Sequence, residues 1–244
     1  MEDLNSEMSK ARWKDFYKVA GTMALLIVLV GLVDMITSML AGEASENSTI
    51  GVVEWFKLFQ TNRFAALSGL GLINIITLSL DVPVYLALYH VHRRNSPAFA
   101  ALATILFFIG TAIYISSNTV FSMLALSNQY AVAAEAQMPL LEAAGRAALA
   151  QGADLTPGMF MGFFFAQTAG LIMTLVLLQG KVFGKWTAWT GLAGFGLTSI
   201  FFVIAAFAPA KFDLAMIFAM FGGLLLMAYH ILLTVRFFHL SKKD

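Results

Sequence analysis

The chain has 244 residues, of which 59% are apolar and only 12% are charged, and its formal net charge is +1. Soluble domains carry about twice that charged fraction, so this composition is typical of a polytopic membrane protein. The near-neutral charge excludes the global basic field that binds nucleic acid. The absence of cysteine excludes disulfides, a thiolate nucleophile and cysteine-ligated metals.

The first apolar run, residues 19–41, follows a charged leader. It is longer than the hydrophobic core of a signal peptide, and Met39-Leu40-Ala41 makes a poor cleavage site. We therefore expect a retained membrane span rather than a cleaved leader.

Six apolar runs are long enough to cross about 30 Å of hydrocarbon as helices. We expect these spans at 19–41, 64–91, 98–126, 157–180, 185–208 and 212–238. The sequence therefore predicts an all-α protein, a single integral membrane domain made of a six-transmembrane-helix bundle.

Lysine and arginine are divided unequally between the two sides of these spans. Eleven lie in the two terminal tails and the even-numbered junctions, and four lie on the opposite side. Because an excess of basic residues marks the cytoplasmic face, we expect both termini in the cytoplasm.

Two connections on the opposite side have helical patterns of their own. In 49–60, TIGVVEWFKLFQ, polar residues recur every third position, which predicts a short interfacial helix with Trp55 at headgroup depth. The alanine-rich segment 127–156 combines strong helix formers with a Glu142–Arg146 pair, and Pro139 is placed to open a helix.

Polar residues inside the spans fall along single faces when each span is drawn as a helix. A polar group facing lipid has no water to bond, so these faces should turn toward other helices or a wet cavity. The face of the third span holds Thr104, Thr111, Tyr114, Asn118 and Ser122. The residues that we expect to line a central polar path are Asp81, Asn74, Tyr85, Asn118, Gln167, His230 and Asp34.

Asp81 is the only charged residue between Arg63 and Arg93, and Pro83 follows two positions later. Proline lacks an N–H and clashes with the carbonyl four residues before it, so we expect a kink at Asp81. Two interpretations stay open. The carboxyl group binds a proton or cation, or it is a protonated or paired acid that only joins helices.

His230 is expected in the same half of the bundle as Asp81. It either forms a proton relay with Asp81 or is satisfied by Tyr229, Tyr85 or a carbonyl on another helix. Asp34 lies nearer the end of its span, which favours a structural role.

No sequence motif typical of an enzyme or a cofactor site is present. There is no Gly-x-Ser-x-Gly, no Cys-x-x-Cys-His and no His-Glu-x-x-His. His90 and His92 would diverge on a helix and could not easily share an ion. We therefore expect no catalytic residue, no metal and no cofactor.

Two stretches carry a family resemblance. The first is TNRFAALSGLGLINIITLSLDVPVYLALYHVHRR, an apolar second span that ends in Tyr89-x-x-x-Arg93, and the second is the alanine-rich loop LSNQYAVAAEAQMPLLEAAGRAALAQGADLTPG. Through them the block from about 60 to 208 resembles a family of uncharacterised prokaryotic six-span proteins, a domain of unknown function. The resemblance implies a bacterial or archaeal inner (plasma) membrane, and no activity or catalytic residue can be carried over from it.

These patterns favour binding or translocation of a small solute or proton through a central polar path. The alternative is a non-catalytic subunit or lipid-binding scaffold of a larger membrane complex, with 49–60 and 127–156 as docking surfaces. The expected partners are membrane lipids, a small-molecule ligand or proton, and other membrane proteins, and not nucleic acid.

Overall fold

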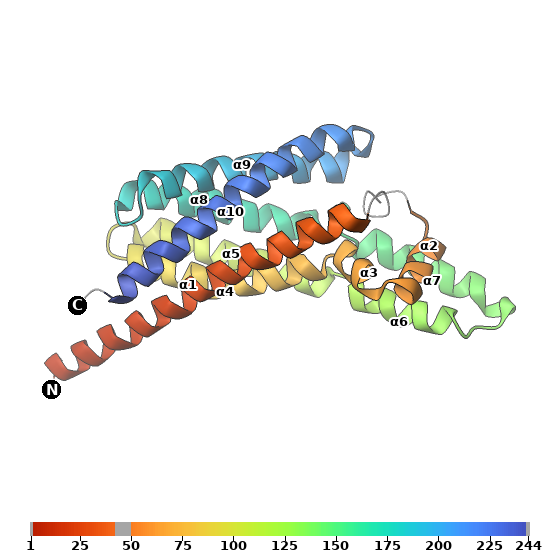
Figure 1. Cartoon of the computed structure of the whole chain (residues 1–244), viewed down its shortest axis with the longest axis horizontal. Helices are drawn as coiled ribbons and strands as arrows, with labels where there is room; N and C mark the ends of the chain where they lie inside the picture. Colours follow the sequence, from red (N-terminus) through yellow and green to blue (C-terminus); the bar gives the residue numbers. More distant parts are fainter. Residues whose placement is uncertain (1, 42–49, 243–244) are drawn as a thin grey trace.

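The computed structural model describes residues 2–41 and 50–242, with side chains from 11–36 and 50–242 (Figure 1). The regular structure in these two ranges is helical, and neither range contains a β-strand. The predicted all-α class is therefore confirmed.

Six helices in the described part of the chain are long and apolar enough to cross a membrane. The shortest, with 21 residues, are about 31 Å long at 1.5 Å per residue, which matches the hydrocarbon thickness of a bilayer. The six are α1 (Glu2–Ala41), α4 (Leu72–His92), α5 (Pro97–Ser117), α8 (Phe160–Gly180), α9 (Lys185–Phe207) and α10 (Phe212–Lys242).

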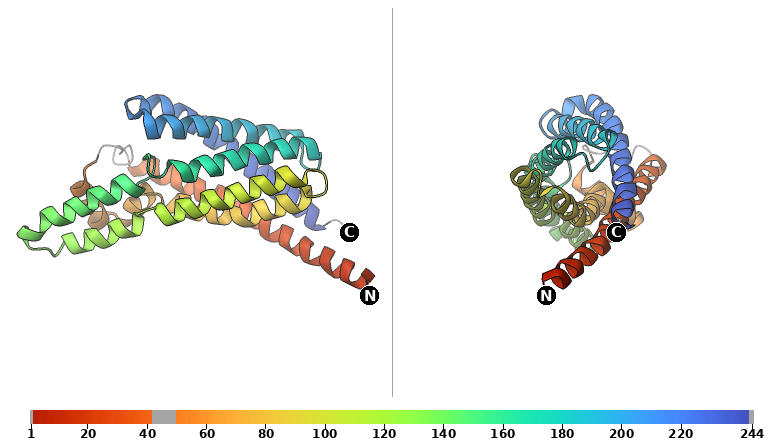
Figure 2. Two further views of the ribbon diagram at one scale, coloured as in Figure 1. Left: turned by 180° about the vertical axis from the view of Figure 1, so that it is seen from behind. Right: turned by 90° about the vertical axis from the view of Figure 1, so that its left-hand side faces the viewer.

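These helices form a closed ring (Figure 2). Around it α1 packs on α4, α4 on α5, α5 on α8, α8 on α9, α9 on α10, and α10 again on α1. Buried side chains such as Leu88, Phe107, Met173 and Phe237 fill the interior. Both ends of the chain lie at one end of the ring, as an even number of spans requires (Figure 1). We call the opposite end the distal end.

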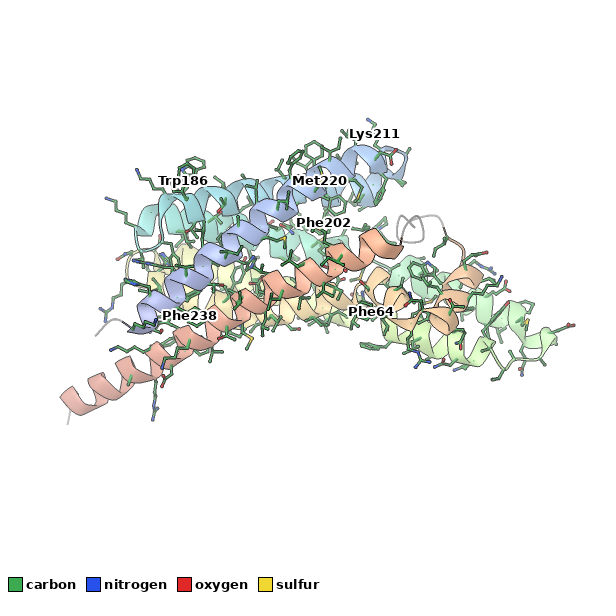
Figure 3. All side chains as sticks on the ribbon, in the orientation of Figure 1. Phe64, Trp186, Phe202, Lys211, Met220 and Phe238 are labelled. Atoms are coloured by element: carbon green, nitrogen blue, oxygen red, sulfur yellow. The ribbon has the colours of Figure 1, made fainter. Side chains whose placement is uncertain are left out.

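The outer surface of the ring is apolar. Trp186 is 80% exposed, Met220 56% and Val235 64%, and Figure 3 shows Trp186 directed away from the bundle. Apolar side chains over so much of a surface are unfavourable in water and favourable in lipid. The exterior therefore agrees with a multi-pass membrane protein.

Small residues allow the helices to approach closely. A Cβ atom on Gly110 of α5 would lie 2.7 Å from the backbone nitrogen of Ala166 in α8, and one on Gly194 of α9 would lie 2.9 Å from Leu226 in α10. Packing of this kind is a main source of helix association in membranes.

Four helices form a second layer beyond the ring, which we call the distal cap (Figure 1). They are α2 (Val52–Thr61), α3 (Arg63–Gly69), α6 (Val120–Tyr130) and α7 (Met138–Gly152), with a short 3-10 turn, η2 (Glu135–Gln137), before α7. Another such turn, η3 (Pro209–Lys211), joins α9 to α10. The cap has an apolar core that includes Trp55, Phe56, Phe59 and Met123.

The cap confirms the two helical connections and corrects one detail. The predicted helix over 49–60 is α2, with residue 49 outside the described residues, but Trp55 is only 6% exposed. Its ring packs inside the cap and does not face lipid headgroups, because α2 turns its apolar face toward α6 and α7. Pro139 opens α7 as expected, and Arg146 lies 3.7 Å from Glu142.

Two predicted spans are interrupted where the ring meets the cap. The expected span 64–91 breaks at Gly71, whose φ of +97° favours glycine and separates α3 from α4. The expected span 98–126 breaks at Asn118, which is extended and separates α5 from α6. Because this break resets the helical register, Ser122 is exposed and does not continue the polar face of α5. Pro83 does not end α4, which remains helical to His92.

Candidate functional site

Most of the expected polar residues fall into two groups. The first is the Asp81–His230 pair, which joins α4 to α10. Nε2 of His230 lies 3.2 Å from Oδ1 of Asp81, and the two side chains are 7% and 15% exposed. Since α1 lies between α4 and α10 in the ring, this contact links two helices that are not neighbours. Of the two alternatives left open for His230, the structure has the contact with Asp81, and whether the pair relays a proton stays a prediction.

The hydrogen bonds of His230 determine how many protons the pair holds. Its Nδ1 lies 2.8 Å from the backbone oxygen of Leu226, one turn earlier in α10. A carbonyl oxygen only accepts, so Nδ1 must carry a proton. Nε2 and the Asp81 oxygen would then repel each other unless a second proton lies between them. The geometry is that of an imidazolium beside a carboxylate, or an imidazole beside a carboxylic acid.

Aromatic rings lie near the pair. Tyr229 meets the His230 ring edge-on, with centroids 5.2 Å apart. Tyr85, one turn after Asp81 on α4, is buried and stacks on Phe107 of α5 at 3.9 Å. Such surroundings offer little solvation to an unbalanced charge, so the pair is most stable when its net charge is zero.

The second group, which we call the distal cluster, lies where the ring meets the cap. It consists of Asn74, Tyr114, Asn118 and Asp154. Asn74 Nδ2 donates to Asp154 Oδ2 at 2.7 Å, and the Tyr114 hydroxyl donates to Asp154 Oδ1. Asn118 Nδ2 donates to the carbonyl of Leu70 at 2.9 Å. The cluster therefore ties the two helix breaks to the α7–α8 loop.

Asp154 is held in an unusual electrostatic environment. Burial raises the pKa of its carboxyl group to about 6, against the opposing effect of hydrogen bonds from Tyr114 and Asn74. The negative charge of Asp34 on α1 raises it further. A carboxyl group of this kind changes protonation near neutral pH.

The remaining expected residues make separate contacts. Gln167 on α8 accepts a hydrogen bond from Thr198 on α9 at 2.9 Å, which joins neighbouring helices. Asp34 Oδ1 accepts from Ser68 on α3 at 2.8 Å, so this acid lies on the distal side with Asp154. Within the described residues, the hydrogen bonds given above thus fall into separate groups and not along one continuous path.

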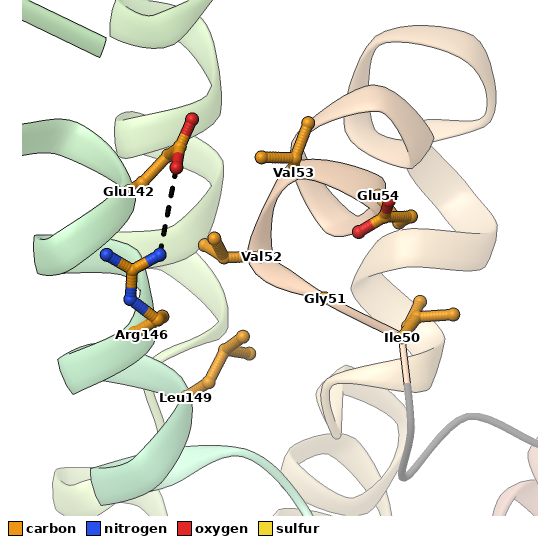
Figure 4. A pocket seen from close by; sticks show the side chains of 8 residues that line it. All are labelled: Ile50, Gly51, Val52, Val53, Glu54, Glu142, Arg146 and Leu149. Carbon is orange, nitrogen blue, oxygen red and sulfur yellow. Dashed lines mark ion pairs between the residues drawn. The ribbon is translucent and has the colours of Figure 1, made fainter. Parts of the chain in front are cut away.

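A surface hollow of about 400 Å³ lies in the distal cap, away from both polar groups. Figure 4 shows it between α2 and α7, with the Glu142–Arg146 ion pair on one wall and Val52 and Val53 on the other. Among the residues that the structure describes, no three His, Cys, Asp or Glu side chains gather to hold a metal ion.

Asp154 and Tyr114 are the residues that sequence reasoning missed as site residues. Tyr114 lies on the predicted polar face of the third span, but Asp154 is one acid in a polar loop. The fold of the loop between Gly152 and Met159 brings it against α4 and α5, next to Asn74, which was an expected site residue.

Compared with protein-family models, curated proteins and solved structures, the chain matches none. The resemblance to a prokaryotic six-span family therefore stays a prediction. The functional proposal below is based on the geometry of the site.

Proposed function

We propose that this chain binds a proton inside its helix bundle and carries it across the membrane, alone or together with a small solute. The observation that supports this proposal is the Asp81–His230 contact. With Nδ1 of His230 bonded to a carbonyl, the 3.2 Å approach of Nε2 to the carboxyl oxygen requires one exchangeable proton.

Loss of that proton would leave one uncompensated negative charge beside the buried rings of Tyr85 and Tyr229. Such a charge is costly in a low-dielectric interior. The pair can relieve it in two ways, by taking up another proton or cation, or by separating so that water enters between α4 and α10. The second response would open the interior, because the pair bridges two helices held apart by α1.

The excess of Lys and Arg at the terminal end supports cytoplasmic termini, and the distal cap would then face the outside. We further propose a bacterial inner membrane as the location. In this orientation, the distal cluster lies at the outer mouth of the bundle and the Asp81–His230 pair lies deeper.

Proton flux into liposomes tests this function. Purified protein is reconstituted in vesicles that contain a pH-sensitive dye, and a potassium diffusion potential drives protons inward. We expect flux above that of empty vesicles, lost in Asp81→Asn and retained in Asp213→Asn. Asp213 is a matched control because it is an exposed acid in the first turn of α10.

Equal flux in wild type, Asp81→Asn and empty vesicles would overturn the proposal. The scaffold function would then be the better account of the cap and its hollow.

A further inference from the structure

The Tyr114 hydroxyl lies between two acceptors but carries a single proton. It contacts Asp154 Oδ1, and it also lies 3.4 Å from the carbonyl oxygen of Gly71. One hydroxyl proton satisfies one of them at a time. The protonation state of Asp154 therefore decides which way the hydroxyl points.

We propose that Asp154 is a second proton-binding site, at the distal mouth of the bundle. The Tyr114 hydroxyl then changes its hydrogen bond between Asp154 and the carbonyl of Gly71, at the helix break, according to whether Asp154 is protonated. When Asp154 is ionised, Tyr114 donates to Oδ1. When a proton from solvent binds Oδ1, that proton is donated to the Tyr114 oxygen, and the hydroxyl turns to Gly71. The step moves one proton from water to the carboxylate and breaks no covalent bond.

The rest of the cluster fits this role. Asn74 donates an amide N–H to the other carboxyl oxygen at 2.7 Å, and an N–H only donates. The Tyr114 hydroxyl at Oδ1 can also accept, so Oδ1 is the oxygen that takes the proton. Among the described residues, the titratable groups that act on Asp154 are Tyr114 from α5, through a hydrogen bond, and Asp34 from α1, through its charge. Asp34 is an acid and disfavours a second negative charge beside it. The raised pKa of Asp154, about 6, agrees with uptake near neutral pH.

The position of the site connects it to the proposed function, on which its role as an entry point rests. Asn74 and Asp81 are seven residues apart on α4, which places them on nearly the same face and about 10 Å apart along the helix. Asp154, held by Asn74, is thus the outer of two proton-binding groups along one face of α4. The ligand at both groups is the same, a proton.

Infrared difference spectroscopy of the reconstituted protein tests the site directly. The sample is taken from about pH 8 to about pH 5 while the stretching band of protonated carboxyl groups is followed. We expect a band with a midpoint near 6 that Asp154→Asn removes. Glu135→Gln, which changes an exposed acid of the cap, should keep it.

Tyr114→Phe keeps Asp154 and removes the hydroxyl that donates a hydrogen bond to its ionised carboxylate. We expect the band to remain and its midpoint to move to higher pH, because the ionised form loses a hydrogen bond. A wild-type spectrum in Asp154→Asn would overturn the site, and an unmoved midpoint in Tyr114→Phe would overturn the hydroxyl switch.

The two proposals fail separately. If Asp154→Asn loses the band while Asp81→Asn keeps full proton flux, the distal site stands and the translocation function falls. If Asp81→Asn abolishes flux while Asp154→Asn keeps both the band and the flux, the distal site falls and the translocation function stands.

Discussion

Trp13 of α1 stacks face to face on His90 of α4, with ring centroids 3.4 Å apart and an angle of 5° between the planes. One turn later, the Tyr17 hydroxyl lies 2.8 Å from Nδ1 of the same histidine. These contacts fix the beginning of the first span to the end of the second. They join the ring near the chain termini, where Arg93 and Arg94 follow.

Removing this stack should loosen the first span. We expect Trp13→Ala to lower the free energy of unfolding by about 1–2 kcal/mol, because an aromatic stack is lost together with its buried area. Amide hydrogen exchange over 11–20 should accelerate. Trp186→Ala is the control, since that ring is 80% exposed. If the amides of Trp13→Ala exchanged as slowly as those of the wild type, the anchoring role would be contradicted.

The α5–α8 crossing depends on Gly110. An added Cβ would lie 2.7 Å from Ala166 N and 2.8 Å from Gly162 O, and the backbone cannot move away without separating the helices. We expect Gly110→Ala to cost about 1–3 kcal/mol of stability in a detergent unfolding assay. Gly196→Ala meets nothing within 4 Å and should be neutral or slightly stabilising. Equal stability of the two variants would show that this close packing is unimportant.

The distal cap should unfold separately from the ring. Phe56 is 1% exposed in the core of the cap, so Phe56→Ala should destabilise the cap by about 3–5 kcal/mol. Limited proteolysis should then cut between α6 and α7 while the six spans remain protected. Val132→Ala, at a residue that is 86% exposed, should leave the cleavage pattern unchanged. Loss of the whole bundle in Phe56→Ala would mean that cap and ring fold as one unit.

Asp154 should make stability depend on pH in a defined direction. Its pKa is about 6 in the folded chain against an ordinary value of 3.8, so between these values the folded state binds more protons than the unfolded state. Its contribution is complete below about pH 4 and is lost as the pH rises through about 6.

The thermal unfolding midpoint should therefore fall across that range, and it should fall less in Asp154→Asn. Glu135→Gln should keep the slope of the wild type. An identical slope in Asp154→Asn would mean that another group causes the pH dependence.

The sequence identified the ring more completely than the cap. Six long apolar runs specify spans because lipid leaves the backbone no partner but itself. The breaks at Gly71 and Asn118 were not predictable in the same way, since apolar residues continue on both sides of each. What ends the spans there is a left-handed glycine and an asparagine bonded to Leu70, and both act through tertiary contacts.

Most site residues on the spanning helices were predictable from the sequence, and the site residue in a loop was not. Asp81 and His230 were expected in one half of the bundle, because helical rise gives depth from the sequence. Asp154 was not expected as a site residue, because its burial depends on how the α7–α8 loop folds back on α4. Helical periodicity carries no information about a loop.

The most direct test of the central claim is nitrogen NMR of histidine-labelled protein in lipid, with wild type compared with Asp81→Asn at neutral pH. We predict that His230 carries a proton on Nδ1, and that its Nε2 signal shows a second proton shared with the carboxyl group. That signature should be lost in Asp81→Asn. A neutral His230 with a bare Nε2 in the wild type, unchanged by the substitution, would contradict a proton held between Asp81 and His230.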